Sequence, residues 1–182
     1  AAMALDATAF PALAGVLAEQ LTEAVPAPVL GGTRPRVVCV VGLHPGAPVD
    51  AVAAALAAQL TPHVRTEILA NPDPAALERA EASLDRVLLT AGAGTPAWDA
   101  CVRQADQVVL VARSVVDPDS VADVDAAGAD LVLVGPRPPE EVVIRWCASL
   151  DPWQVTMATE GVPAGELRQL ADYVIDRHYP EC

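Results

Sequence analysis

The stretch RVVCVVGLHPGAPVD, residues 36–50, decides the fold of this chain. Its first part, Arg36–Gly42, is a continuous apolar run, which is typical of a strand buried on both faces of a parallel sheet. An Ala-rich helix is predicted over Pro48–Leu60, so the two segments make a first strand–helix unit. The connecting loop occupies the position at which a phosphate-binding loop would lie.

The same alternation of strand and helix continues along the chain. It predicts right-handed strand–helix–strand units. The fold class is therefore α/β: a three-layer, Rossmann-like, mostly parallel and doubly wound sheet of about six strands. Further strands are predicted at 64–69, 86–90, 107–112, 131–134 and 153–158, and further helices at 74–84, 96–105, 120–127, 139–150 and 164–178.

The segment before the first strand differs from the rest. Residues 1–35 are predicted to form a helix, over 5–24, and a linker that is rich in Pro and Gly. Residues 36–182 are predicted to form the Rossmann-like domain. Because the chain begins with Ala1 rather than Met, we expect it to be part of a longer protein.

Composition narrows the class of partner. The 182 residues suit one domain, with 53% hydrophobic and only 3% aromatic residues, so the core must consist of Ala, Val and Leu. The net charge of −13 leaves no basic face for nucleic acid or for an anionic membrane surface. The four cysteines form no close pair and no apolar run could span a bilayer, so we expect a cytoplasmic protein that is not itself a membrane domain. The bias towards Ala, Arg, Val, Pro and Gly is typical of a bacterial genome rich in G and C.

The loop after the first strand lacks the side chains of an NTPase. A working phosphate loop needs a Lys that reaches the phosphates and a hydroxyl that holds Mg²⁺, but Val49 and Asp50 occupy those places. Pro45 and Pro48 remove two backbone donors from the loop. All eleven basic residues are Arg, so no Lys elsewhere can substitute. A GxGxxG fingerprint is also absent from this loop. We therefore expect neither ATP hydrolysis nor a bound cofactor.

A ligand crevice is nevertheless expected at the carboxyl ends of the strands, formed by 42–48, 90–95 and 112–119. His44 is either functional there or a solvated loop residue. Arg113 either binds an anion or pairs with the nearby Asp117 and Asp119. The Gly-rich turn 90–95 either cradles an anion or is a tight turn in which Thr95 caps the next helix. The candidate ligand-binding residues are Gly42, His44, Gly46, Thr90, Gly92 and Arg113.

No catalytic or metal-binding group can be assembled from the sequence. The three His residues are well separated and have no Cys or carboxylate at ligand spacing. No Ser lies in a GxSxG elbow, and Cys101 is predicted to be a buried structural thiol. We therefore predict that the chain is not an enzyme.

The stretch TPAWDACVRQADQVVLV, residues 95–111, carries a family resemblance. It resembles the Rossmann-like domain, a degenerate relative of the ParA/MinD ATPases, that precedes the patatin domain in neuropathy target esterase-like phospholipases with cyclic-nucleotide-binding modules. The matching positions are Trp98, Cys101, Arg103, Gln104, Ala105 and Asp106. The resemblance is collinear over most of the chain, but the patatin Gly-rich loop and Ser–Asp dyad are absent, so it brings no catalytic residue here.

The resemblance implies a regulatory or connecting module whose partner is a protein or a neighbouring domain. Trp98, Cys101 and Val102 lie on one helical face and are predicted to pack on the sheet. Asp106 is predicted to end that helix and fix the start of the fourth strand. Two alternatives stay open: a binder of a small molecule or nucleotide in the crevice, and an enzyme of unidentified chemistry that uses His44 with Asp50 or Arg113.

Overall fold

A computed structural model of the chain describes residues 37–70, 73–121, 124 and 128–176. They belong to one compact unit. The helix and linker predicted over 1–35 lie outside the described residues. The strands are β1 (Val37–Gly42), β2 (Thr66–Ala70), β3 (Arg86–Ala91), β4 (Gln107–Arg113), β5 (Asp130–Val134) and β6 (Gln154–Ala158); the helices are α2 (Val49–Leu60), α3 (Pro74–Ser83), α4 (Pro96–Gln104), α5 (Glu140–Leu150) and α6 (Arg168–Asp176), with single 3₁₀ turns η1 (Pro118–Ser120) and η2 (Ala164–Leu167).

The six strands form one sheet in the order β2-β3-β1-β4-β5-β6. Every neighbouring pair is parallel, so the predicted α/β, Rossmann-like class is confirmed, with a sheet that is wholly parallel rather than mostly so. β1 lies between β3 and β4 in the middle of the sheet, and all six of its residues are buried. This places the loop after β1 between the loops that follow β3 and β4.

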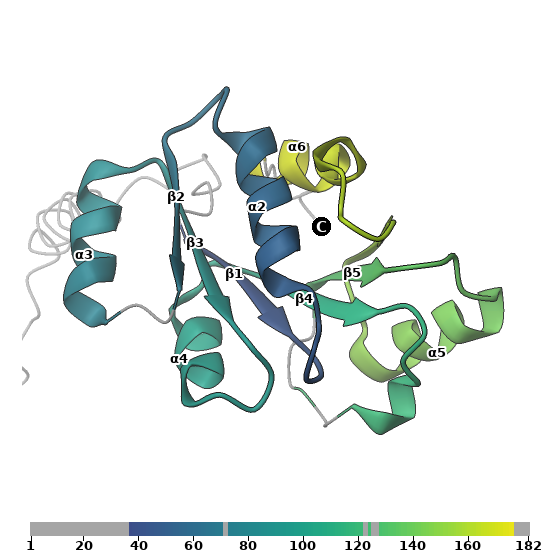
Figure 1. Ribbon diagram of the computed structural model, residues 1–182. Helices are drawn as coiled ribbons and strands as arrows, with labels where there is room; N and C mark the ends of the chain where they lie inside the picture. The colour runs from purple at the N-terminus through teal and green to yellow at the C-terminus, as the bar shows by residue number, and fades with distance from the viewer. Residues whose placement is uncertain (1–36, 71–72, 122–123, 125–127, 177–182) are drawn as a thin grey trace, which may run out of the picture. The chain divides into compact units, whose positions relative to one another are not determined.

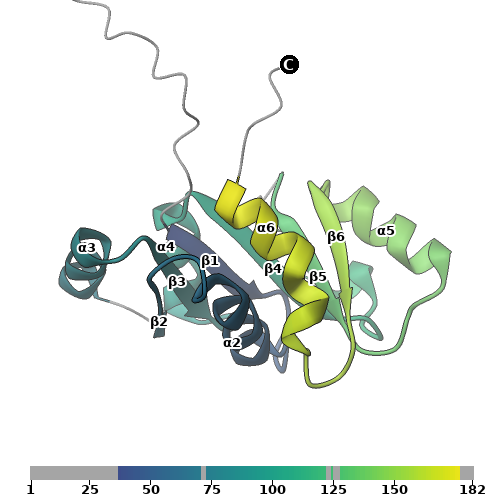
Figure 2. The same ribbon diagram turned by 90° about the horizontal axis from the view of Figure 1, so that it is seen from above.

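Helices cover both faces of the sheet (Figure 1). Since alternate residues of a strand point to opposite faces, Val38 and Val40 pack with α2 and α6, whereas Cys39 and Val41 pack with α3, α4 and α5. Figure 2 shows α2 and α6 side by side over the first of these faces. Small Ala and Val side chains let the helices approach the sheet closely, as the composition predicts.

The connection between β4 and β5 corrects one sequence prediction. The helix predicted over 120–127 is absent at its described positions, and a single 3₁₀ turn ends at Ser120. Asp117 caps this turn by accepting a hydrogen bond from the Asp119 N–H, and the Ser120 hydroxyl also donates to the Asp117 carbonyl. These local bonds close the turn, and Val121 continues in an extended conformation (φ −89°, ψ 140°). Residues 122–123 and 125–127 lie outside the described part of the chain.

Candidate functional site

The loop that follows β1 folds back over the end of its own strand. The N–H of Leu43 donates to the Val111 carbonyl at 2.9 Å, which extends the β1–β4 pairing by one residue. A Cβ on Gly42 would lie 3.1 Å from Ala47 Cβ and 3.1 Å from Val49 Cγ2. A glycine is therefore needed at position 42 because the loop packs directly on it.

Most backbone donors of this loop are absent or already used. Pro45 and Pro48 have no N–H, the Ala47 N–H donates to the His44 carbonyl at 3.1 Å, and the Val49 N–H donates to the Ala47 carbonyl at 2.8 Å. A phosphate cradle requires several N–H groups that point outwards together. Within residues 45–49 only Gly46 keeps an N–H that these contacts do not use. The exposed carboxylate of Asp50 in the first turn of α2 opposes an anion further.

His44 connects the loop to β4. Its Nδ1 lies 2.9 Å from the Pro45 carbonyl oxygen, and its Nε2 accepts a hydrogen bond from the Arg113 N–H at 2.9 Å. Because a carbonyl can only accept, the ring proton is assigned to Nδ1 and the imidazole is neutral. Both ring nitrogens are thus engaged in holding the loop, and His44 is half-buried rather than a freely solvated side chain.

Arg113 fastens the other side of the same loop. Its Nε donates to the Gly46 carbonyl at 3.2 Å, and its Nη1 pairs with Glu160 at 2.9 Å. The alternative in which Arg113 pairs with Asp117 and Asp119 is wrong. Arg145 of α5 pairs with those two carboxylates instead, at 3.0 and 3.2 Å.

Sequence reasoning missed both Glu160 and Arg145. Each lies far along the chain from its partner, 47 residues for Glu160 and 28 or 26 for Arg145. No local pattern could indicate these pairs, because the partners meet only when β4, β5 and β6 align in the sheet.

The turn after β3 holds the other predicted ligand-binding residues. Thr95 stands at the N-cap position of α4 but does not cap it; its hydroxyl and its N–H both donate to the Gly92 carbonyl, at 2.9 and 3.4 Å. The turn is tight, as one alternative proposed, but Thr95 stabilises the turn rather than the helix. Thr90 and Gly92 line a pocket of about 380 Å³ beside the first turn of α2, apart from the His44–Arg113 contacts.

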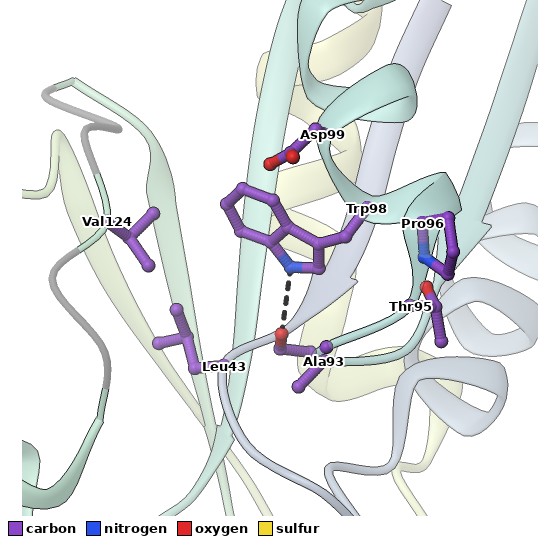
Figure 3. Close-up of a pocket in the computed structure, with 9 residues that line it drawn as sticks. Leu43, Ala93, Thr95, Pro96, Trp98, Asp99 and Val124 are labelled. Carbon is purple, nitrogen blue, oxygen red and sulfur yellow. Dashed lines mark hydrogen bonds between the residues drawn. The ribbon is translucent and has the colours of Figure 1, made fainter.

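Two of the matched residues of α4, Trp98 and Cys101, contact β1. The indole N–H of Trp98 donates to the Gly42 carbonyl at 2.9 Å, so α4 is pinned to the end of β1 (Figure 3). Cys101 is 2% exposed and its thiol contacts that of Cys39 on β1. Burial raises the pKa of the Cys39 thiol well above its usual range, and the neighbouring Cys101 adds to the shift. Burial also raises the pKa of Cys101, so both thiols are protonated packing groups. Arg103 and Gln104 are exposed.

Asp106 joins the start of β4 to the start of β1. Its carboxylate accepts a hydrogen bond from the Val37 N–H at 2.9 Å, and its own N–H donates to the Val37 carbonyl at 2.9 Å. Asp106 therefore fixes the first residue of β1, in addition to preceding β4. Because β1 is central, this pair of bonds sets the register of the middle of the sheet.

A pocket of about 470 Å³ opens beside Trp98, at the carboxyl ends of β1 and β3. Leu43 and Val124 form one wall, the Trp98 indole and Asp99 form the other, and the turn 93–96 closes the end (Figure 3). Of the predicted ligand-binding residues, only Gly42 lines this pocket.

Comparison with known proteins identifies no family. No protein-family model matches the chain, and no curated protein matches it significantly. Among the described residues, no group of three or more His, Cys, Asp or Glu side chains could hold a metal ion, and no helix is both long and apolar enough to cross a bilayer. What the structure establishes is the fold, a Rossmann-like domain whose sheet has six parallel strands.

Proposed function

We propose that this chain is a non-catalytic regulatory or connecting module with a degenerate phosphate loop, from a neuropathy target esterase-like patatin protein. The proposal rests on one observation: the loop after β1 is closed by hydrogen bonds within itself and to β4. Two of its positions are Pro, two of its N–H groups bond within the loop, and His44 and Arg113 fasten it to β4. A loop that is closed in this way has little left with which to hold a phosphate.

The surroundings of the candidate catalytic groups support the same proposal. A general base needs an accessible lone pair, but His44 Nε2 accepts from the Arg113 N–H and its Nδ1–H faces the Pro45 carbonyl. Asp50, the other candidate partner, is exposed in the first turn of α2. The resemblance over residues 95–111 adds to this because Trp98, Cys101 and Asp106 serve packing and register rather than chemistry. In this proposal the partner is a protein or a neighbouring domain, in the cytoplasm.

Nucleotide binding tests the proposal directly. The 182-residue chain is incubated with Mg·ATP or Mg·GTP, and phosphate release and the thermal midpoint are measured. We expect no turnover and no shift of the midpoint. The same measurements on His44→Ala and Arg113→Ala show whether the locked loop is the cause. Turnover by the unaltered chain, or a nucleotide-dependent shift that either variant abolishes, contradicts the proposal.

The connecting role has its own test. The coding sequence on either side of this chain in its parent gene is read. We expect a cyclic-nucleotide-binding domain before it and a patatin hydrolase after it. A parent gene that encodes neither contradicts the assignment to esterase-like proteins, while the nucleotide result stands independently.

A binder of small molecules is the second candidate function, and the pocket beside Trp98 favours it. Its volume of about 470 Å³ falls within the usual range for ligand sites. It also lies where ligands bind in open α/β sheets, outside the carboxyl ends of the strands.

A further inference from the structure

The pocket beside Trp98 has one rigid aromatic wall. The indole N–H is held by the Gly42 carbonyl at 2.9 Å, which fixes the orientation of the ring before any ligand arrives. Leu43 and Val124 lie across the gap from the indole, and the Asp99 carboxylate lies next to its six-membered ring (Figure 3). A preformed wall lowers the entropic cost of binding.

The side-chain hydrogen-bond donors that line this pocket, those of Trp98 and Thr95, already have partners. The Trp98 N–H bonds to the Gly42 carbonyl, the Thr95 hydroxyl bonds to the Gly92 carbonyl, and Pro96 has no N–H. Among the described residues that line the pocket, the remaining polar side chain is the carboxylate of Asp99, which can only accept hydrogen bonds when ionised. A ligand that pairs with Asp99 must therefore supply a donor or a positive charge.

Asp99 is the one charged side chain among the described residues that line the pocket. No basic side chain lines it, and no basic side chain forms an ion pair with Asp99 within the described residues. Arg103, one helical turn further along α4, is exposed and forms no ion pair with Asp99. The chain as a whole carries a net charge of −13. An indole face beside an unpaired carboxylate is the arrangement that attracts an organic cation.

We propose that this pocket binds a compact organic ammonium ion, placed over the Trp98 indole and against the Asp99 carboxylate. Apolar substituents of the ion would contact Leu43 and Val124 on the opposite wall. An anion is disfavoured by Asp99, and a neutral apolar ligand would leave that carboxylate without a partner. The inference rests on the second candidate function, binding of a small molecule in this pocket, and not on the connecting module, since nucleotide binding would contradict the module and leave this pocket unaffected.

The experiment titrates tetramethylammonium chloride into the 182-residue chain and follows the indole N–H signals by ¹H–¹⁵N NMR. The chain has three Trp residues, and Trp98→Phe assigns the relevant signal. Sodium chloride at equal ionic strength controls for salt, and tert-butanol provides a similar shape without charge. We expect a saturable shift of the Trp98 signal with tetramethylammonium, no shift with sodium chloride, and binding of tert-butanol weaker by at least about fivefold.

Substitution of Asp99 tests whether the charge of its carboxylate contributes to binding. Asp99→Asn is expected to weaken tetramethylammonium binding by about fivefold or more, whereas Asp99→Glu retains it. The matched control is Asp172→Asn, which removes an exposed carboxylate from α6 on the other face of the sheet. A shift that never saturates, equal binding of tert-butanol, or unchanged binding by Asp99→Asn overturns the proposal. If Asp99→Asn does not fold, Asp99→Ala is compared with the folded Asp99→Glu instead. Loss of tetramethylammonium binding in Asp99→Ala alone then supports the proposal, and equal binding by the two variants overturns it.

Discussion

Replacement of Asp106 tests how the centre of the sheet is held. The Asp106 carboxylate accepts a hydrogen bond from the Val37 N–H at 2.9 Å, and Val37 is 1% exposed. Asp106→Ala removes this acceptor and leaves a buried N–H at the start of β1. A hydrogen bond to a charged group contributes about 1.5–3 kcal/mol. Asp106 itself is exposed, so water can partly replace the carboxylate, and we take the lower end, a loss of about 1.5 kcal/mol.

Asp106→Asn separates the acceptor from its charge. The Asn side-chain oxygen can still accept from the Val37 N–H, so we expect a loss of only about 0.5 kcal/mol. For a domain of this size, 1 kcal/mol corresponds to about 2–4 °C in the thermal midpoint, so Asp106→Ala should lower it by about 3–6 °C.

The assay is urea denaturation followed by circular dichroism, with the thermal midpoint as a second measurement. Asp172→Ala, which removes an exposed carboxylate on α6, is the matched control. If the free energy of unfolding of Asp106→Ala lies within about 0.5 kcal/mol of the control, the carboxylate does not stabilise β1 and the reasoning is refuted. A loss in Asp106→Asn equal to that in Asp106→Ala would show that charge, rather than the acceptor, matters.

Four further experiments test other parts of the structure. Gly135→Ala is expected to cost about 1–3 kcal/mol in thermal denaturation, because Gly135 has φ +131° and an added Cβ would lie 2.7 Å from the buried Ser114 hydroxyl; a stability equal to that of the unaltered chain would contradict this. In His44→Ala, hydrogen exchange of the Arg113 amide is expected to be roughly tenfold faster, because this amide loses its acceptor, while amides in the middle of β4 keep their rates. An unchanged exchange rate at Arg113 would show that the imidazole does not hold the loop. Iodoacetamide is expected to modify the exposed Cys147 at least ~100-fold faster than the buried Cys39, as peptide mass spectrometry would show. Since burial raises the pKa of Cys39, the unfolded thiol ionises first, so the free energy of unfolding should fall as pH rises above about 8.5. Cys39→Ala should show a smaller fall, because the buried Cys101 still contributes.

The repeating elements could be predicted because their signals are local. The apolar run of β1 is buried along its whole length, and the helix predicted over 96–105 is α4, which begins at Pro96 as expected. The helix predicted over 120–127 is absent at its described positions for a local reason as well. Asp117 and Ser120 close a one-turn structure with their own hydrogen bonds, and Val121 continues in an extended conformation.

The candidate site could be predicted only in outline. The sequence placed His44, Gly46 and Arg113 at one edge of the sheet, and the structure brings these three into direct contact. The ion pair between Glu160 and Arg113 joins residues that are 47 positions apart in the sequence, and the hydrogen bond from Trp98 to Gly42 joins residues 56 positions apart. No short sequence pattern can include both partners of either contact. Thr90 and Gly92 belong to the same predicted crevice, but the pocket that they line includes none of His44, Gly46 and Arg113.

The loop at residues 42–50 shows where the two kinds of information divide. The sequence alone determined that the loop follows a buried strand and that it lacks the Lys and hydroxyl side chains of a working phosphate loop, because these are properties of the residues themselves. Only the tertiary structure decided what the loop does instead. Its closure depends on an imidazole that meets the Arg113 amide, a guanidinium that reaches Gly46 and Glu160, and an indole that bonds to Gly42. Those contacts exist because parallel strands bring the ends of distant segments to one edge of the sheet.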